Sequence, residues 1–518
     1  MTVIEQSPLI RKKRLSSSAM MFVVAVIALL YCPFFNVQVI GDGYVGDTMI
    51  QIRIGMDMLS HKSFLLHDLY SWHENLNWVP HEEGWYFLVG AAYKLMGLAG
   101  VIGLASVFNY AMGILIFREN LKITNPYMVV LAAAAARVCS FPNYNARPHL
   151  VSMLLVVIFM FYVLDESKPA VRKAVMFPVF VFIMAWFHGG MVPLFFAVFA
   201  VFIIIELIYK DYKTFGRYII GLLAGFAASV LNPCGVEIWT YGLVQARVYD
   251  DLWKYNMEWN PKSFTILEIT IILIVFVGFA VDKRVREFDK KTITKLCFLC
   301  MFLIMSCKYC RFMNYTGLMI AMFGAEEIYI LLIWINDNIT RFDVKKMKLR
   351  DIANYVLTSF CVLFFLFNSV TTWKTYFKTN TMSDCSAIAA YDENVIDIVK
   401  EKGYSRIYNS FNTGTWLAFY GIPVHVDNRT DLYMAEYSGV DHLRGKILVT
   451  TIYDMDKFVD EYHPDALVLD LQPRTTEDYF AADLYASANY NVIYDNLCYS
   501  NHDPDVSIRW LVVECVYD

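Results

Sequence analysis

Apolar runs of membrane-spanning length recur along the first 370 residues. A helix needs about 20 mainly apolar residues to cross the ~30 Å hydrocarbon layer of a bilayer. Candidate spans lie near 18–37, 85–117, 127–141, 148–164, 174–189, 190–209, 217–231, 264–281, 292–306, 313–334 and 352–371. The basic stretch from Arg11 to Arg14 precedes a long apolar run that no small-x-small cleavage site follows. We therefore expect a signal-anchor helix there and not a cleaved signal peptide.

The run 85–117 decides the predicted topology. A single straight helix of this length would measure ~50 Å. The run contains Gly97 and Gly100, so it is either two spans or one span with an interfacial extension. Lys and Arg concentrate in cytoplasmic loops, and a single crossing puts nearly every basic cluster on one side. These clusters lie near 11–14, 118–122, 168–173, 210–217, 282–291 and 341–350. We predict a single crossing, about eleven transmembrane helices, a cytoplasmic N-terminus and an extracytoplasmic C-terminus.

The pattern changes from about residue 380. Apolar runs shorten to strand length in RIYNS, PVHVD, DALVLD, YNVIYD and SIRWLVVEC, and helical patterns such as TGTWLAFYG and MDKFVDEYH lie between them. Strands that alternate with helices indicate a small α/β domain. The prediction is a polytopic α-helical membrane protein with a transmembrane domain over 1–379, a large first extracytoplasmic loop over 40–84, and an extracytoplasmic α/β domain over 380–518.

Composition agrees with a plasma-membrane location. Hydrophobic residues make up 57% of the chain and charged residues 18%, whereas a soluble domain carries about 25% charge. The net charge of -5 argues against nucleic acid as a partner. The sequence contains no Walker loop, no Rossmann glycine triplet, no zinc quartet and no HExxH motif, so ATP-driven transport and nicotinamide chemistry lack support.

The first loop holds the densest group of polar candidates. The pattern from Asp47 to Leu59 is helical, and Asp47 and Gln51 share one face because they are four residues apart. A carboxylate directly above the membrane suits a general base for a sugar hydroxyl or a ligand of a divalent cation. Both roles stay open, as does an amphipathic interfacial helix with a solvated polar face. Later in the loop come Arg53, Asp68, His81 and Glu82.

Basic and polar residues also gather in four later turns that the topology places outside. They are Arg147 and His149 in NARPH, His188 in WFHGG, Glu258 in EWNP, and Lys308 and Arg311 in SCKYCRF. Arg binds phosphate through two parallel hydrogen bonds and Lys as a point charge. Each residue alone also suits a structural role, such as snorkelling to the interface. One shared site requires Asp47, Arg147 and His188 to lie within about 20 Å of one another.

Asp427 and Arg429 follow a predicted strand in the C-terminal part. Site residues often follow strands in α/β sheets, and a structural Asp–Arg pair fits the same pattern.

The chain resembles a large group of bacterial membrane proteins related to GT-C glycosyltransferases. The resemblance rests on the ordered segments GDTMIQIRIG, HDLYS, HEEGW, NARPH, WFHGG, LNPCG, EWNP, TGTWLAFYG and VDNRTDLY, which cover most of the chain. It implies a transferase that takes sugar from a polyprenyl-phosphate carrier at the outer membrane face, with Asp47 at the position of the catalytic or metal-binding carboxylate. The chain departs from the oligosaccharyltransferase branch because it lacks a WWDxG motif. Glu83 and Gly84 also separate His81-Glu82 from Trp85, which puts the role of His81-Glu82 in question.

The leading hypothesis is an inverting glycosyltransferase with a membrane-lipid donor and a glycan, lipid or protein acceptor. The hypothesis assigns catalysis to Asp47, Asp68 and Glu82, donor-phosphate binding to Arg147, His149, His188, Lys308 and Arg311, and substrate binding to Gln51, Arg53, His81, Glu258, Asp427 and Arg429. A transporter or flippase of a lipid-linked glycan would instead need ionisable residues along a path inside the spans. A non-catalytic envelope assembly protein is the third hypothesis.

Overall fold

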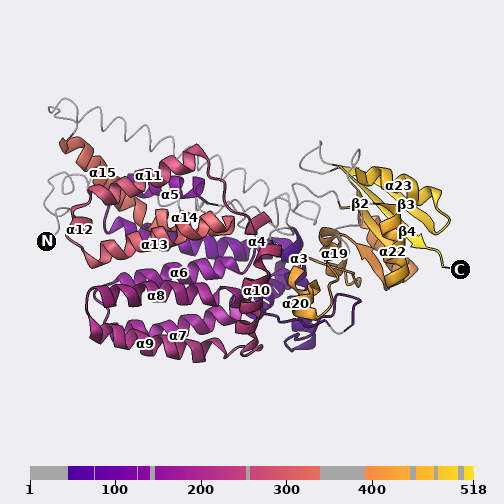
Figure 1. Ribbon diagram of the computed structural model, residues 1–518, viewed down its shortest axis with the longest axis horizontal. Helices are drawn as coiled ribbons and strands as arrows, with labels where there is room; N and C mark the ends of the chain where they lie inside the picture. The colour runs from indigo at the N-terminus through magenta and orange to yellow at the C-terminus, as the bar shows by residue number, and fades with distance from the viewer. Residues whose placement is uncertain are drawn as a thin grey trace.

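Long helices form one end of the elongated molecule, and a small sheet with its own helices forms the other (Figure 1). The computed structural model describes residues 45–74, 76–124, 126–140, 146–252, 257–338, 391–443, 451–471, 476–499 and 507–517. The helices of the first part are α3 (Val45–His61), α4 (Glu83–Leu121), α5 (Pro126–Val138), α6 (His149–Leu164), α7 (Ala170–Phe187), α8 (Val192–Ile208), α9 (Tyr212–Ser229), α10 (Glu237–Leu252), α11 (Ile266–Val281), α12 (Lys283–Arg286), α13 (Lys290–Lys308), α14 (Met313–Met319) and α15 (Ala325–Asn338). Short 3₁₀ turns lie at η1 (Gly189–Met191), η2 (Met257–Trp259) and η3 (Cys310–Phe312), and the π-helical segment η4 (Ile320–Gly324) joins α14 to α15.

Helices coincide with every span predicted between residues 85 and 334. Four of these segments are long and apolar enough to cross a membrane: Glu83–Leu121, Ala170–Phe187, Gly189–Ile208 and Cys310–Ile335. The predicted spans 18–37 and 352–371 lie outside the described residues, as does the predicted domain boundary near 380. Helix α4 bends at Gly97, whose φ of 60° is a left-handed backbone conformation that glycine adopts without strain. The bend divides the long run that the sequence left ambiguous.

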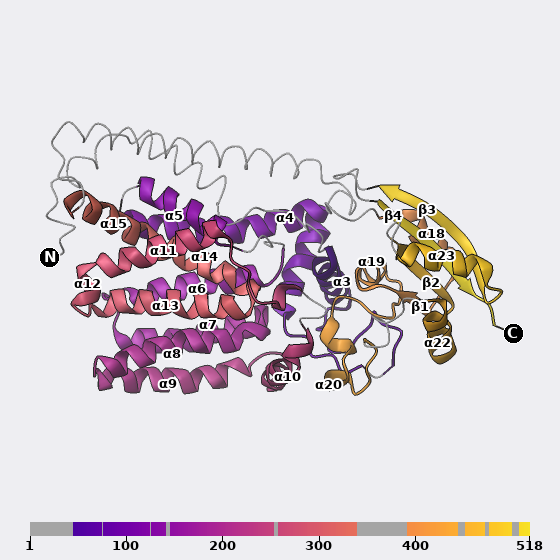
Figure 2. The ribbon, with the colours of Figure 1, turned by 45° about the horizontal axis from the view of Figure 1, so that its top comes forward.

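Three of the basic clusters, 168–173, 210–217 and 282–291, gather at one end of the bundle. The turns after α6, α8 and α11 lie at that end, away from α10 and the sheet (Figures 1 and 2). Aspartates cap α9 and α13, which start there: Asp211 accepts a hydrogen bond from the backbone N–H of Thr214 at 3.0 Å, and Asp289 from that of Thr292 at 2.9 Å. These N-caps satisfy backbone donors that the first helical turn leaves without partners.

The sheet at the other end has the strand order β1-β2-β4-β3. Its strands are β1 (Ile407–Asn409), β2 (Ala466–Leu471), β3 (Tyr490–Tyr499) and β4 (Ser507–Cys515). Strand β1 pairs parallel to β2, whereas β4 pairs antiparallel to both β2 and β3. The helices of this part are α18 (Glu393–Lys402), α19 (Phe411–Phe419), α20 (Ala435–Ser438), α22 (Ile452–Tyr462) and α23 (Thr476–Ala486), with the 3₁₀ turn η6 (Thr430–Tyr433).

Both faces of the central strand β2 are apolar and buried. Along β2, Val468 packs into the large core that continues toward the helical bundle, while its neighbours Leu467 and Leu469 pack into a smaller core with Met455 and Leu484 of α22 and α23. Successive side chains of a strand point to opposite faces. Strands covered on both faces read as continuous apolar runs, which is the pattern of DALVLD.

The predicted strand PVHVD, residues 423–427, is wrong. Val424 instead forms single β-bridges with Ser71 and Ile407. Its N–H donates to the carbonyl of Tyr70 at 2.9 Å, and its carbonyl accepts from the N–H of Trp72 at 3.1 Å. The backbone of this segment therefore forms its hydrogen bonds with the first loop. The two segments are far apart in the sequence, so the local pattern could not predict this pairing.

Helix α3 and the loop after it tie the C-terminal part to the bundle. The α3 residue Arg53 donates to the carbonyl of Phe419 in α19 at 3.4 Å. In the loop, Asp68 pairs with Arg429 at 2.6 Å, and His73 lies 2.7 Å from His425 between ring nitrogens. This connection fixes α3, which carries Asp47 and Gln51, between the sheet and the bundle.

A close crossing of two glycines sets the position of α3 on α4. A Cβ atom at Gly55 would collide with the carbonyl of Tyr86, and one at Gly90 would collide with the Gly55 backbone. We expect Gly55→Ala to destabilise the protein by about 1–3 kcal/mol, the usual cost of overpacking. Thermal unfolding in detergent measures this. Gly103→Ala in α4 is the matched control, because a Cβ there meets no atom within 4 Å, and an equal loss in both variants would contradict the prediction.

Candidate active site

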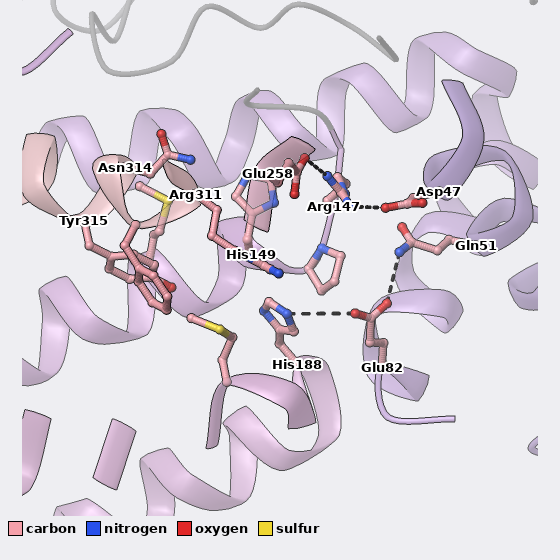
Figure 3. Close-up of a pocket in the computed structure, with 14 residues that line it drawn as sticks. Asp47, Gln51, Glu82, Arg147, His149, His188, Glu258, Arg311, Asn314 and Tyr315 are labelled. Carbon is pink, nitrogen blue, oxygen red and sulfur yellow. Dashed lines mark hydrogen bonds and ion pairs between the residues drawn. The ribbon is translucent and has the colours of Figure 1, made fainter. Parts of the chain in front are cut away.

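One pocket collects the polar residues of six separate segments at the end of the bundle nearest the sheet (Figure 3). It has about 620 Å³ of empty space, its open mouth included. The lining residues are Asp47, Gln51, Glu82, Arg147, Pro148, His149, Met153, His188, Met191, Glu258, Arg311, Phe312, Asn314 and Tyr315. Asp47, Arg147 and His188 therefore meet the requirement for one shared site.

Arg147 bridges two carboxylates across the pocket wall. Its Nη2 forms an ion pair with Oδ2 of Asp47, and its Nη1 donates to Oε1 of Glu258 at 2.7 Å (Figure 3). The three side chains come from α3, from the residue before Pro148, and from η2. The Thr48 hydroxyl also donates to the backbone carbonyl of Ala146 at 3.3 Å. This hydrogen bond joins the start of α3 to the Arg147 segment, in addition to the ion pair between Asp47 and Arg147.

Local sequence explains the position of Arg147. Pro148 has φ -60° and precedes the first residue of α6. Proline is favoured at helix starts because its missing N–H would have no partner there. Arg147 thus lies just before the first turn of the apolar helix α6, where its charge faces the pocket and not the bundle interior.

A second chain of hydrogen bonds holds Glu82. Its Oε2 accepts from Nε2 of Gln51 at 3.0 Å, and Oε1 of Gln51 accepts from Nε1 of Trp85 at 2.9 Å. The other oxygen, Oε1, lies 3.9 Å from Nε2 of both His81 and His188. Gln51 can point only one way in this arrangement, because its amide donates on one side and accepts on the other.

His188 is fixed from two directions. Its Nδ1 lies 2.6 Å from the hydroxyl of Ser152 on α6. The next residue, Gly189, donates its N–H to the carbonyl of His81 at 2.7 Å, and a Cβ there would collide with Ile238. This close approach explains why glycine follows His188 in the sequence WFHGG.

Arg311 contributes a second guanidinium to the pocket. It lies over the ring of Trp259, with Cζ 4.6 Å from the ring centroid, a cation–π geometry that orients the side chain without neutralising it. Among the residues that the structure describes, no carboxylate lies within ion-pair distance of Arg311. Its charge is therefore available to an anionic group in the pocket.

Burial shifts the protonation of the pocket side chains. It raises the pKa of Glu82 above the usual 4.5 and lowers that of His188 well below the usual 6.5, since desolvation disfavours the charged form. Burial also raises the pKa of Asp47 above 3.8, although Arg147 opposes this shift. Near neutral pH, His188 is thus an uncharged imidazole that binds by hydrogen bonds.

The residues around Asp47 do not fit a resident divalent cation. Arg147 already occupies the space between the Asp47 and Glu258 carboxylates. Over the described ranges, no group of three His, Cys, Asp or Glu side chains is arranged to hold a metal ion. Since the Arg147 guanidinium bonds both carboxylates, a cationic side chain lies where a divalent ion would bind.

Several predicted site residues lie elsewhere. Asp68, Asp427 and Arg429 form their own buried ion-pair cluster, in which Arg429 bonds both carboxylates at 2.6 Å. Arg53 pairs with Asp57 at 2.9 Å. Lys308 ends α13 with its Nζ 5.1 Å from the ring of Tyr309. None of these five predicted residues lines the pocket, whereas His81 borders it through Glu82.

Three polar residues at the pocket were not among the predicted site residues: Ser152, Asn314 and Tyr315. All three lie inside apolar helical runs, where a single polar residue is ordinarily read as part of the packing. Asn314 and Tyr315 begin α14 just after Arg311, and Ser152 lies one turn after His149. Their positions in the first turns of helices that start at a polar cluster were the available signal.

The chain matches no protein-family model and no curated protein. Solved structures of similar fold, however, do match it. The apo oligosaccharyltransferase of Archaeoglobus fulgidus superposes with a TM-score of 0.54 at 10% identity over 88% of this chain and 70% of that one. The same archaeal enzyme, AglB, in complex with an inhibitory peptide and a dolichol-phosphate gives a TM-score of 0.54 at 9% identity, over 87% and 69% of the two chains.

A second solved structure matches nearly end to end. ArnT from Cupriavidus metallidurans in the apo state superposes with a TM-score of 0.52 at 12% identity, over 96% of this chain and 97% of that one. AglB and ArnT are both GT-C superfamily glycosyltransferases. At such low identity the agreement concerns the course of the backbone, and it shows that this chain shares the fold of AglB and ArnT.

Proposed function

We propose that this protein transfers a sugar from a polyprenyl-phosphate-linked donor to an acceptor hydroxyl in the pocket. The observation that carries the proposal is the joining of Asp47, Glu82, His188 and Arg311 in one open pocket at the end of an apolar bundle. Such a place suits a substrate with an apolar tail, an anionic link and a polar sugar. The fold shared with AglB and ArnT supports the same reaction class.

The donor phosphate binds at Arg311 in this proposal. Arg311 carries a charge that no described carboxylate pairs with, and its planar fork suits the bidentate binding of phosphate oxygens. His149 and His188 line the same pocket and add hydrogen bonds. Met153 and Phe312 line its apolar side, where the first carbons of the lipid would lie. The dolichol-phosphate bound to AglB is a lipid phosphate of this kind.

Asp47 serves as the general base. Arg147 engages its Oδ2, and 28% of the side chain remains exposed. In the proposed step the acceptor O–H gives its proton to the Asp47 carboxylate, and its oxygen bonds to the anomeric carbon of the sugar. The bond from that carbon to the phosphate oxygen breaks, and the electron pair leaves with the phosphate. Attack opposite the leaving group inverts the anomeric configuration.

The proposed orientation puts the pocket outside the cell. The basic clusters 168–173, 210–217 and 282–291 lie at the opposite end of the bundle (Figure 2), and cytoplasmic loops are rich in Lys and Arg. The protein is then a multi-pass plasma-membrane protein with a transmembrane domain over 1–379 and an extracytoplasmic domain over 380–518. The acceptor is accordingly a glycan, lipid or protein of the cell envelope, which the C-terminal domain helps to position.

Radiolabelled polyprenyl-phosphate sugar in isolated membranes tests the proposal. We expect transfer of label to an envelope acceptor, and a rise in KM of about tenfold or more for Arg311→Ala, since a charged hydrogen bond contributes about 1.5–3 kcal/mol. Arg286→Ala is the matched control, because Arg286 lies in α12 at the other end of the bundle. Equal KM values for both variants would exclude Arg311 as the phosphate anchor. A flippase would move the labelled lipid without transferring its sugar.

The pH dependence of transfer follows from the buried acids. The raised pKa values of Asp47 and Glu82 mean that both take up protons at a higher pH than exposed carboxyls do. A base must be deprotonated to act, so the rate falls as pH is lowered. Because Asp47 is the proposed base, we expect the midpoint of this acid limb above pH 3.8, the usual pKa of Asp. A pH–rate profile whose midpoint lies below 3.8 would contradict the raised pKa.

A further inference from the structure

Two carboxylates and one guanidinium form a charge cluster in the pocket wall. Asp47 and Glu258 each bond a different nitrogen of Arg147. The Glu258 side chain is 7% exposed and that of Arg147 17%. Asp47 and Glu258 are far apart in the sequence, but both carboxylates face the Arg147 guanidinium.

We propose that Arg147 is a built-in cation that takes the place of a divalent metal between Asp47 and Glu258. The protein then transfers sugar without a divalent metal ion. Removal of the Arg147 side chain leaves an acidic pair that binds such an ion. The statement on metal-free transfer rests on the proposed function, whereas the statement on metal binding does not.

Charge and geometry both support this assignment. A guanidinium presents its N–H groups in a rigid planar fork and keeps its charge at every physiological pH. Burial alone would lower the pKa of Arg147, but the two carboxylates raise it above the usual 12.5. The cation is therefore permanent, and no exchange with solvent ions is needed to keep Asp47 ionised beside Glu258.

Loss of this cation would leave two acids close together in a partly desolvated wall. Like charges at such a site disfavour each other's ionised form. A proton or a divalent cation relieves this repulsion. Oxygen ligands of this type suit Mg²⁺ and Mn²⁺. The space freed by the arginine side chain gives the ion and its waters room.

Binding of Mn²⁺, followed by electron paramagnetic resonance on the purified full-length protein, tests the inference. We expect wild type and Asp47→Asn to bind the same amount of Mn²⁺. Arg147→Ala should bind one more ion per chain, and Arg147→Ala combined with Glu258→Gln should lose it. Arg147→Ser, which frees the same space and adds a hydroxyl oxygen, is the second variant should the alanine form fail to fold. An ion on wild type that Asp47→Asn removes, or no added ion on a folded Arg147 variant, would overturn the inference.

Transfer measured after treatment with EDTA provides the second readout. We expect wild-type transfer to be unchanged by EDTA, and a loss that Mn²⁺ restores would contradict the built-in cation. Absence of any transfer, with the Mn²⁺ results as expected, would refute the proposed function and leave the cation assignment standing. The failure of one proposal is therefore distinguishable from failure of the other.

Discussion

Asp47→Asn is expected to lower the rate of sugar transfer by about 100- to 10,000-fold, the usual contribution of a general base. Asparagine has nearly the same shape as aspartate but does not accept a proton at neutral pH. Because Arg147 keeps Glu258 as a partner at 2.7 Å, the pocket wall should survive the change. The rate constant in membranes with labelled donor is the measurement, and the KM for the donor should change little.

Asp165→Asn is the matched control for this variant. Asp165 follows α6 at the end of the bundle opposite the pocket, and 43% of its side chain is exposed. We expect its transfer rate to equal that of wild type. Retention of full activity by Asp47→Asn, with the same amount of folded protein in the membrane, would remove Asp47 from catalysis and favour the non-catalytic hypotheses.

Arg429→Met is expected to have the largest effect on stability. The side chain of Arg429 is 9% exposed and joins Asp68 of the first loop to Asp427 of the C-terminal part, both at 2.6 Å. It also lies between the rings of Tyr70 and Trp78, at 5.3 and 5.2 Å from their centroids. Its loss leaves two buried carboxylates without a counter-charge, which costs about 3–5 kcal/mol. Thermal unfolding and limited proteolysis of the first loop measure this loss.

Arg509→Met serves as the comparison. Arg509 pairs with Asp495 on the sheet surface at 2.7 Å, and both side chains are about 30% exposed. Exposed ion pairs contribute about 0–1 kcal/mol, so this variant should unfold near the wild-type temperature. Adding Asp68→Asn to Arg429→Met should recover part of the lost stability because it removes one unpaired charge. Equal unfolding temperatures for the two arginine variants would show that the buried cluster is not what joins the loop to the C-terminal part.

The apolar pattern predicted the helices well because length and hydropathy are local properties. Each run between residues 85 and 334 became a helix, and four strands of the C-terminal part lie where short apolar runs predicted them. The segment 423–427 was the exception, since Val424 finds its hydrogen-bond partners in the first loop. A local pattern carries no information about a partner more than 300 residues away.

The sequence predicted which residues belong to the candidate site, but it did not predict which of them contact one another. Asp47, Arg147, Glu82, His188 and Arg311 could be named because polar residues at the ends of apolar runs are few. Their contacts depend on how the helices pack, and packing placed Arg147 on Asp47 and on Glu258.

The same limit explains the residues that do not line the pocket. Asp68 lies in the same acidic loop as Asp47, but the course of the loop carries it to Arg429. Charge and spacing along the chain are alike for a catalytic acid and for one that joins two parts of the fold.

A structure of the protein with a polyprenyl phosphate bound tests the central claim most directly. The account predicts phosphate density in the pocket within hydrogen-bond distance of Arg311, beside His149 and His188, with the lipid running along the apolar helices. Phosphate at the opposite end of the bundle, or outside the pocket that Asp47 and Glu82 line, would contradict it.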